Sequence, residues 1–150
     1  MEKLKIDFGS GYNPNSDYKI CDITYLPNLD YVYNQDDNVI VGCEYCSVDE
    51  FYLRNVVHHL PDMKKTFSCL IKYLKSNGEI KIIDVRKEYF KQNLILDILW
   101  YRYVIPRYEV WFSKCYRDYF KILEGLGMEK IDYYIQDEKE VSVWRKSLKN

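Results

Sequence analysis

The sequence predicts a layered α/β protein in which helices pack against a parallel β-sheet. Strand-like and helix-like segments alternate along its 150 residues, which is the pattern of α/β sandwiches. The clearest strand, Glu79–Val85, is an almost continuous apolar run, as in strands buried on both faces of a parallel sheet. The clearest helix, Asp62–Leu74, places its apolar side chains on one face.

The N-terminal half holds four further short apolar segments that are expected to be strands: Leu4–Phe8, Tyr18–Ile23, Leu29–Tyr33 and Val48–Leu53. Asp62 is the expected N-cap of the helix, because its side chain can accept hydrogen bonds from amides of the first turn. The Ser-Asn-Gly tripeptide at 76–78 is expected to end the helix before the next strand begins.

The C-terminal half is expected to contain two helical stretches and a hairpin. The first stretch covers Tyr89–Ile105 and must end at Pro106, because proline breaks a helix. The second covers Ser113–Leu126. The strands Met128–Ile135 and Val141–Trp144 follow, and the polar segment between them predicts a terminal hairpin.

Length and composition predict one domain over residues 1–150. Hydrophobic residues make up 47% of the chain and the net charge is −1, which disfavours a general nucleic-acid binder. The charged start predicts no signal peptide. The longest apolar stretch, Asn93–Ile105, is interrupted by Asp97 and Arg102 and is too short to cross a membrane. We therefore expect a cytoplasmic protein.

The cysteines predict neither a disulfide framework nor a metal site. There are five of them, an odd number at irregular spacing. Cys43 and Cys46 form a single pair that lacks a second pair at the spacing of a zinc site. We expect free thiols.

The segment with the clearest chemistry is the Gly9-Ser10-Gly11 turn, which follows the first strand. Glycine allows positive φ and a close approach of a ligand to the main chain, and open α/β sheets bind ligands at the carboxyl ends of their strands. Asp22 ends the next strand, where its carboxylate can accept hydrogen bonds from both hydroxyls of a ribose. An ordinary tight turn and a solvated carboxylate are the alternatives.

These residues do not fit the dinucleotide-binding fingerprint. That fingerprint places an acidic residue about 20 positions beyond its glycines, whereas Asp22 lies 11 residues after Gly11. The third glycine of the fingerprint is also missing. A nicotinamide-dependent oxidoreductase is therefore disfavoured.

Four segments, in the right order, resemble the class I S-adenosylmethionine-dependent methyltransferases, in particular the methyltransferase type 11 branch. Gly9–Pro14 (GSGYNP) is similar to the family's first turn, and Val48–Leu60 to its fourth strand and following loop. Leu74–Asp84 is similar to its LKPGG turn and fifth strand, with Ser76 and Asn77 in place of the usual Pro and Gly. The region from the helix that ends near Gly127 onward resembles the family's last helix and strand pair.

The resemblance implies a Rossmann-like methyltransferase sandwich. Its sheet would be mostly parallel and seven-stranded, with a reversed C-terminal strand and a shortened first helix. It also implies S-adenosylmethionine as the cofactor. The cofactor-binding residues that follow from the motifs are Asp7, Gly9, Ser10, Gly11, Asp22, Ile23 and Asn55.

Within this set, Asp7, Gly9 and Gly11 would line the methionine part and Asp22 would hold the ribose. Arg54, beside Asn55, would face the cofactor from the end of the fourth strand. The adenine pocket would lie after the third strand, near Asn34–Asp36 or Gly42–Glu44.

The acceptor side has fewer candidates. His58 is the candidate general base, while His59 fits a structural role better. Asp84 either holds a substrate or caps a turn. Tyr89–Trp111 is rich in aromatic residues and is expected to cover the acceptor site, with core packing or a dimer surface as the alternative role of its rings.

Three functions remain open from the sequence. The first is a methyltransferase acting on an unidentified small-molecule or sugar-like acceptor. The second is a methyltransferase acting on nucleic acid or protein, although the Asp/Asn-Pro-Pro-aromatic motif of amino-methylating DNA enzymes is replaced by Arg54-Asn55-Val56-Val57. The third is a non-catalytic domain that binds the cofactor or only keeps the fold. A domain this small can also pair as a homodimer.

Overall fold

A single mixed β-sheet organises the chain in the computed structural model, which describes residues 2–9, 15–22, 28–57, 60, 62–85 and 119–147. Eight strands are hydrogen-bonded in the order β4-β3-β2-β1-β5-β6-β8-β7. Their bounds are β1 Lys5–Phe8, β2 Lys19–Asp22, β3 Tyr31–Asn34, β4 Val39–Val41, β5 Val48–Arg54, β6 Leu74–Val85, β7 Met128–Gln136 and β8 Lys139–Lys146. The helices are α1 Met63–Tyr73 and α3 Tyr119–Gly125.

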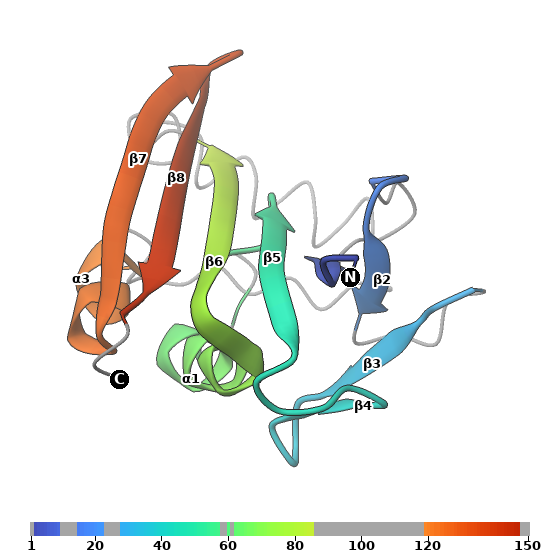
Figure 1. Ribbon diagram of the computed structural model, residues 1–150. Coiled ribbons are helices and arrows are strands. Elements are labelled where there is room, and N and C mark those ends of the chain that lie inside the picture. The colour runs from blue at the N-terminus through green and yellow to red at the C-terminus, as the bar shows by residue number, and fades with distance from the viewer. Residues whose placement is uncertain are drawn as a thin grey trace, which may run out of the picture.

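Strands β3, β2, β1, β5 and β6 run parallel, so their carboxyl ends meet at one edge of the sheet. Figure 1 shows β5, β6, β8 and β7 side by side in this order. Strand β8 is antiparallel to β6 and lies between β6 and β7, which confirms the reversed C-terminal strand. The fold class is therefore the expected one, with one strand more than the expected seven. The additional strand is β4, which forms an antiparallel hairpin with β3 at the far edge.

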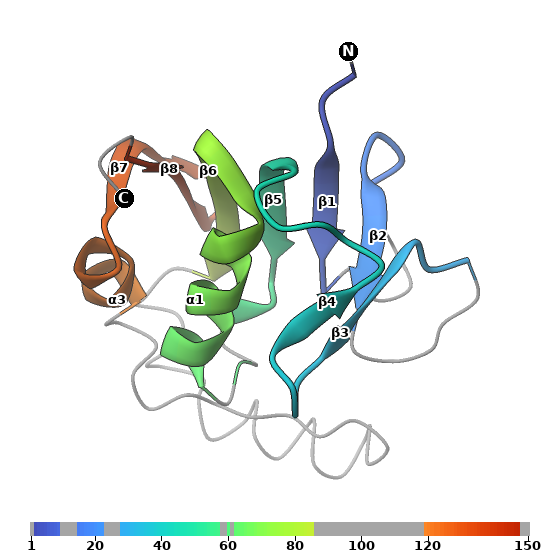
Figure 2. The same cartoon turned by 60° about the horizontal axis from the view of Figure 1, so that its bottom comes forward.

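Helices α1 and α3 lie side by side against one face of the sheet (Figure 2). The core between them and the strands is built from buried apolar side chains, of which Phe51, Ile80 and Trp144 are among the largest. Phe120 of α3 packs its ring 5.3 Å from that of Trp144. Alternate strand residues, such as Tyr52, point to the opposite face.

The end of α1 differs from the prediction. The helix begins as expected, with the Asp62 side chain accepting a hydrogen bond from the Lys65 amide at 3.0 Å. It ends at Tyr73, and Leu74 already takes an extended conformation and opens β6 without a loop. The tripeptide at 76–78 lies inside β6, where the pairing register with β5 shifts. Asn77 takes a φ of 64° there, so the expected turn is an irregularity within the strand.

The predicted terminal hairpin is confirmed. Strands β7 and β8 pair from Met128 and Lys146 to Gln136 and Lys139. The two residues between them, Asp137 and Glu138, have φ values of 51° and 64°. Positive φ at both central residues is the geometry of the two-residue turns that join tightly twisted strands.

Candidate functional site

The turn after β1 brings the carboxyl ends of three strands together. Gly9 has a φ of 73°, and its amide donates a hydrogen bond of 2.8 Å to the carbonyl of Cys21 in β2. A Cβ atom at Gly9 would lie 2.4 Å from Cγ2 of Val56, just beyond β5. Glycine is therefore required both by its conformation and by close packing. The positive φ is as expected, but Val56 fills the space beside Gly9.

Asp7 is a buried acidic residue of this edge. Its side chain is only 1% exposed, and Oδ2 accepts a hydrogen bond of 2.8 Å from the amide of Asn15. Burial raises the pKa of the Asp7 carboxyl, and the negative charge of Asp22 adds to the rise. The Asn15 amide and the positive charge of Arg54 lower the pKa in part. The structure thus gathers the charges of Asp7, Asp22 and Arg54 within interaction range.

Asp22 ends β2 and is half-buried. It pairs with Val32 of β3 in the parallel ladder, and Cys21 just before it accepts a hydrogen bond from the Gly9 amide, so neighbours on both sides of β2 fix its place at the carboxyl edge. A carboxylate at the end of a parallel strand can reach a ligand that lies across the edge. This is the position that the sequence predicted for it.

Asn55 follows β5 directly and takes a φ of 56°. Its amide donates to the carbonyl of Ile83 in β6 at 2.8 Å. Its side-chain oxygen Oδ1 accepts a hydrogen bond of 3.2 Å from Nζ of Lys139, at the start of β8. Asn55 is thereby tied to two strands at the carboxyl edge.

The two regions suggested for an adenine pocket lie at opposite ends of the short β3–β4 hairpin. Asn34 ends β3 at the carboxyl edge, and its side chain caps the hairpin turn by accepting from the Asp37 amide at 3.1 Å. Gly42–Glu44 follows β4, which runs back toward the amino end of β3, and Gly42 lies beside Tyr31 there. Burial raises the pKa of the Cys21 thiol most, and the nearby Cys43 adds to the rise, so the second region also borders β2.

Asp84 lies near the carboxyl end of β6 and is fully buried. It stands opposite Glu140 of β8 in the ladder, and the carboxyls of both raise the pKa of the buried Tyr119 hydroxyl, which burial raises most. Asp84 therefore faces the layer that holds α3. Within the described ranges, no group of three or more His, Cys, Asp or Glu residues could hold a metal ion.

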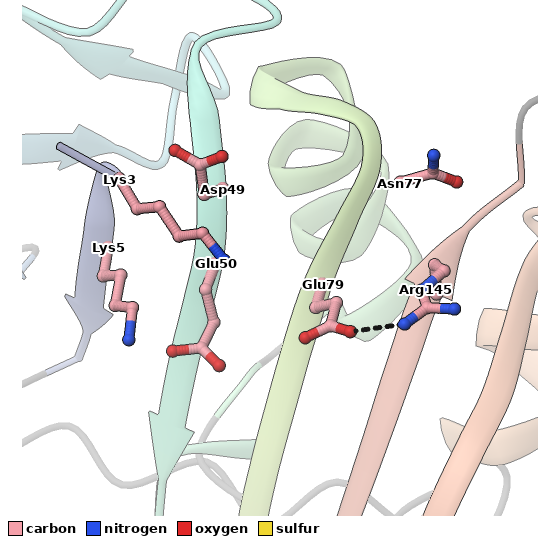
Figure 3. A pocket seen from close by; sticks show the side chains of 7 residues that line it. All are labelled: Lys3, Lys5, Asp49, Glu50, Asn77, Glu79 and Arg145. Atoms are coloured by element: carbon pink, nitrogen blue, oxygen red, sulfur yellow. Dashed lines mark hydrogen bonds and ion pairs between the residues drawn. The ribbon is translucent and has the colours of Figure 1, made fainter. Parts of the chain in front are cut away.

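A polar hollow of about 470 Å³ lies at the opposite, amino edge of the sheet (Figure 3). Its three acidic side chains already have partners. Asp49 contacts Lys75 at 3.3 Å, Glu79 contacts Arg145 at 3.0 Å, and Glu50 accepts from the Tyr18 hydroxyl. These pairs link neighbouring strands at the amino edge and so have a structural role there. We therefore place the candidate site at the carboxyl edge.

Solved structures with a similar fold were found for nearly the whole chain. An S-adenosylmethionine-dependent methyltransferase from Methanosarcina mazei matches with a TM-score of 0.65 at 11% identity, covering 99% of this chain and 95% of that one. One from Thermotoga maritima matches with a TM-score of 0.66 at 12% identity, covering 98% and 84%. The trans-methyltransferase CalH, solved with S-adenosylhomocysteine, matches with a TM-score of 0.65 at 14% identity, covering 97% and 51%. No protein-family model and no curated protein matches the sequence.

This chain has the class I methyltransferase fold. Strands β3, β2, β1, β5, β6, β8 and β7 account for the seven strands implied by the resemblance, and the β3–β4 hairpin adds the eighth at the edge. Among the residues that the structure describes, no helix is long and apolar enough to span a membrane.

Several sequence predictions for this methyltransferase fold lie outside the described residues. They are Ser10, Gly11, Ile23, His58, His59 and the whole Tyr89–Trp111 segment together with the shortened first helix. The described part places Asp7, Gly9, Asp22, Arg54 and Asn55 at one edge.

Three residues of this edge were missed by sequence reasoning. They are Asn15, whose amide binds Asp7, Val56, which fills the space beside Gly9, and Lys139, which binds Asn55. Lys139 stands 84 positions from its partner, and no spacing in the sequence signals this contact. Only the register of β8 against β6 brings it there.

Proposed function

We propose that this protein binds S-adenosylmethionine across the carboxyl edge of its sheet and transfers the methyl group to a small-molecule or sugar-like acceptor. The observation that carries the proposal is the grouping of Asp7, Asp22 and Arg54 beside the positive-φ turn at Gly9. Ligands of open α/β sheets bind at this edge. The shared fold, including that of a structure solved with S-adenosylhomocysteine, supports the assignment.

The charges of the site fit the cofactor in two places. The methionine part is a zwitterion, and the edge offers it the carboxylate of Asp7 and the guanidinium of Arg54. The ribose offers two neighbouring hydroxyls, and the half-buried carboxylate of Asp22 can accept from both. Assignment to the type 11 branch stays a prediction.

When bound, the cofactor supplies a methyl group that is already activated by a positively charged sulfur. The protein then has to align the acceptor and exclude water. A general base is required only when the acceptor atom carries a proton, and His58 remains the candidate for that role. The balanced charge of the chain, −1, favours a small acceptor over a nucleic acid.

The test is calorimetry with S-adenosylhomocysteine, which binds without reacting. The wild type is expected to bind. Asp22→Ala is expected to bind at least about tenfold more weakly, because lost hydrogen bonds to a charged group cost about 1.5–3 kcal/mol. Asp30→Ala is the matched control. Asp30 also contacts β2, because its side chain accepts a hydrogen bond from the Ile20 amide at 2.9 Å, but it lies just before the amino end of β3 and not at the carboxyl edge.

Two outcomes would contradict the proposal. The first is a folded wild type that fails to bind S-adenosylhomocysteine, and the second is an Asp22→Ala variant that binds as tightly as the wild type. Release of S-adenosylhomocysteine from S-adenosylmethionine across a panel of small acceptors then tests catalysis. Binding without turnover on small, nucleic-acid or protein acceptors would indicate a non-catalytic domain.

A further inference from the structure

The hydrogen bond between Lys139 and Asn55 spans the carboxyl edge. Lys139 opens β8 and stands opposite Val85 of β6, while Asn55 follows β5 on the other side of β6. The lysine side chain therefore crosses the end of β6 to place Nζ 3.2 Å from Oδ1 of Asn55. Both side chains are partly buried, so the contact is shielded from water more than a surface pair would be.

The chemistry of lysine fixes how the Asn55 amide is turned. An ammonium group can only donate hydrogen bonds, so the atom of Asn55 that faces Nζ must be the oxygen. The amide NH₂ group then points away from Lys139. The backbone cannot easily rotate to undo this, because the left-handed φ of 56° is held by the bond from the Asn55 amide to Ile83.

We propose that Lys139 is a positioning residue that turns the NH₂ group of Asn55 toward the cofactor, where it donates a hydrogen bond to the carboxylate of the amino-acid part. The inference rests on the proposed function. It deepens that function because it assigns a role to a residue of the terminal hairpin, far from the strands that carry the glycine turn.

The geometry of the hairpin explains how Lys139 is held in place. Lys139 pairs with Gln136 across the two-residue turn and with Val85 on the other side. Backbone hydrogen bonds on both sides of β8 thus fix the Cα position of Lys139. Only its side-chain rotamers have to be ordered to reach Asn55.

The test compares lysine variants by calorimetry with S-adenosylhomocysteine. Lys139→Met keeps the length of the side chain but removes the donor, and it is expected to bind about three- to tenfold more weakly. Lys139→Arg keeps a donor and is expected to bind within about twofold of the wild type. Lys146→Met is the matched control at the other end of β8, where Nζ donates to the carbonyls of Ile71 and Leu74. It should melt at a lower temperature and bind normally.

A second variant separates positioning from simple structural support. Asn55→Asp keeps an oxygen for Lys139 and replaces the NH₂ donor by a second oxygen. The Lys139 contact becomes an ion pair, so the melting temperature should not fall, while affinity for S-adenosylhomocysteine should fall at least about tenfold.

Wild-type affinity in either Lys139→Met or Asn55→Asp would overturn the inference. Failure of the wild type to bind S-adenosylhomocysteine would overturn the proposed function with it. If the wild type binds S-adenosylhomocysteine and both Lys139→Met and Asn55→Asp bind it as tightly as the wild type does, only the positioning role fails. Should Lys139→Met not fold, Asn55→Asp and Lys139→Arg still decide the question.

Discussion

The contact between Gly9 and Val56 gives the sharpest prediction about the candidate site. Replacing Gly9 by alanine adds one methyl group at a position where Cγ2 of Val56 lies 2.4 Å away. Ordinary carbon contacts begin at about 3.5 Å, so either the turn or the end of β5 must move. The alanine would also have to adopt a φ of 73°.

Two costs add up in this variant. The left-handed conformation costs a residue with a Cβ about 1–2 kcal/mol, and an extra methyl group in a packed site costs about 1–3 kcal/mol. The Gly9→Ala protein should therefore lose about 2–5 kcal/mol of unfolding free energy. This is a large part of the about 5–15 kcal/mol typical of a whole domain.

The assay is urea unfolding of Gly9→Ala, Val56→Ala and the double variant. Removing both γ-methyl groups of Val56 relieves the clash but leaves the backbone strain. The double variant should therefore be more stable than the sum of the single losses predicts, with a coupling of about 1–3 kcal/mol. Gly125→Ala in α3 is the control, because a Cβ there meets no heavy atom within 4 Å. It should be neutral or slightly stabilising.

Two results would refute this reasoning. One is a Gly9→Ala protein that loses less than about 0.5 kcal/mol, the range of ordinary surface changes. The other is a double variant whose loss equals the sum of the two single losses, since that would mean Val56 does not restrict the space beside Gly9.

Three further predictions concern a buried carboxyl, a helix cap and a hairpin turn. Burial raises the pKa of Asp7, so ionisation of its carboxyl destabilises the fold as the pH rises above 3.8, the pKa of the group in the unfolded chain. Asp7→Asn should therefore raise the melting temperature at pH 7, and this gain should shrink toward pH 3.5. A gain that does not depend on pH would contradict this cause. Asp62→Ala removes the hydrogen bond from the Lys65 amide to the N-cap side chain and should lower the free energy of unfolding in urea by about 1 kcal/mol. An unchanged urea midpoint would argue against the cap. Replacing Asp137-Glu138 by Asn-Gly suits the two positive φ values and should stabilise the hairpin by about 0.5–1 kcal/mol, so a lower melting temperature would speak against this turn geometry.

Local patterns in the sequence were enough to predict most elements of the sheet. The apolar run of β6, the amphipathic face of α1 and the polar break before β8 each depend on neighbours within a few positions. The same holds for the glycine turn after β1 and for Asp22 at the end of β2. The position of a carboxylate or glycine at the end of a strand is fixed by the strand that precedes it.

Short or irregular segments were beyond such patterns. Strand β4 has only three residues and is stabilised by its pairing with β3 and by α1, where the Tyr73 hydroxyl accepts from the Ile40 amide at 2.9 Å. The tripeptide at 76–78 looks like a loop because of its composition, but Leu74 and Glu79 on either side of it both pair with β5, which draws it into β6. Tertiary contacts outweighed local propensity at both places.

The sequence by itself therefore determined the class of fold and the chemistry available at the ends of β1, β2 and β5. The tertiary structure alone decided which of those groups meet. Val56 reaches Gly9 because β1 and β5 are adjacent, and Lys139 reaches Asn55 because β8 lies beside β6 in a fixed register. Contacts of this kind depend on the order and alignment of strands across the sheet, which side-chain periodicity along one strand does not encode.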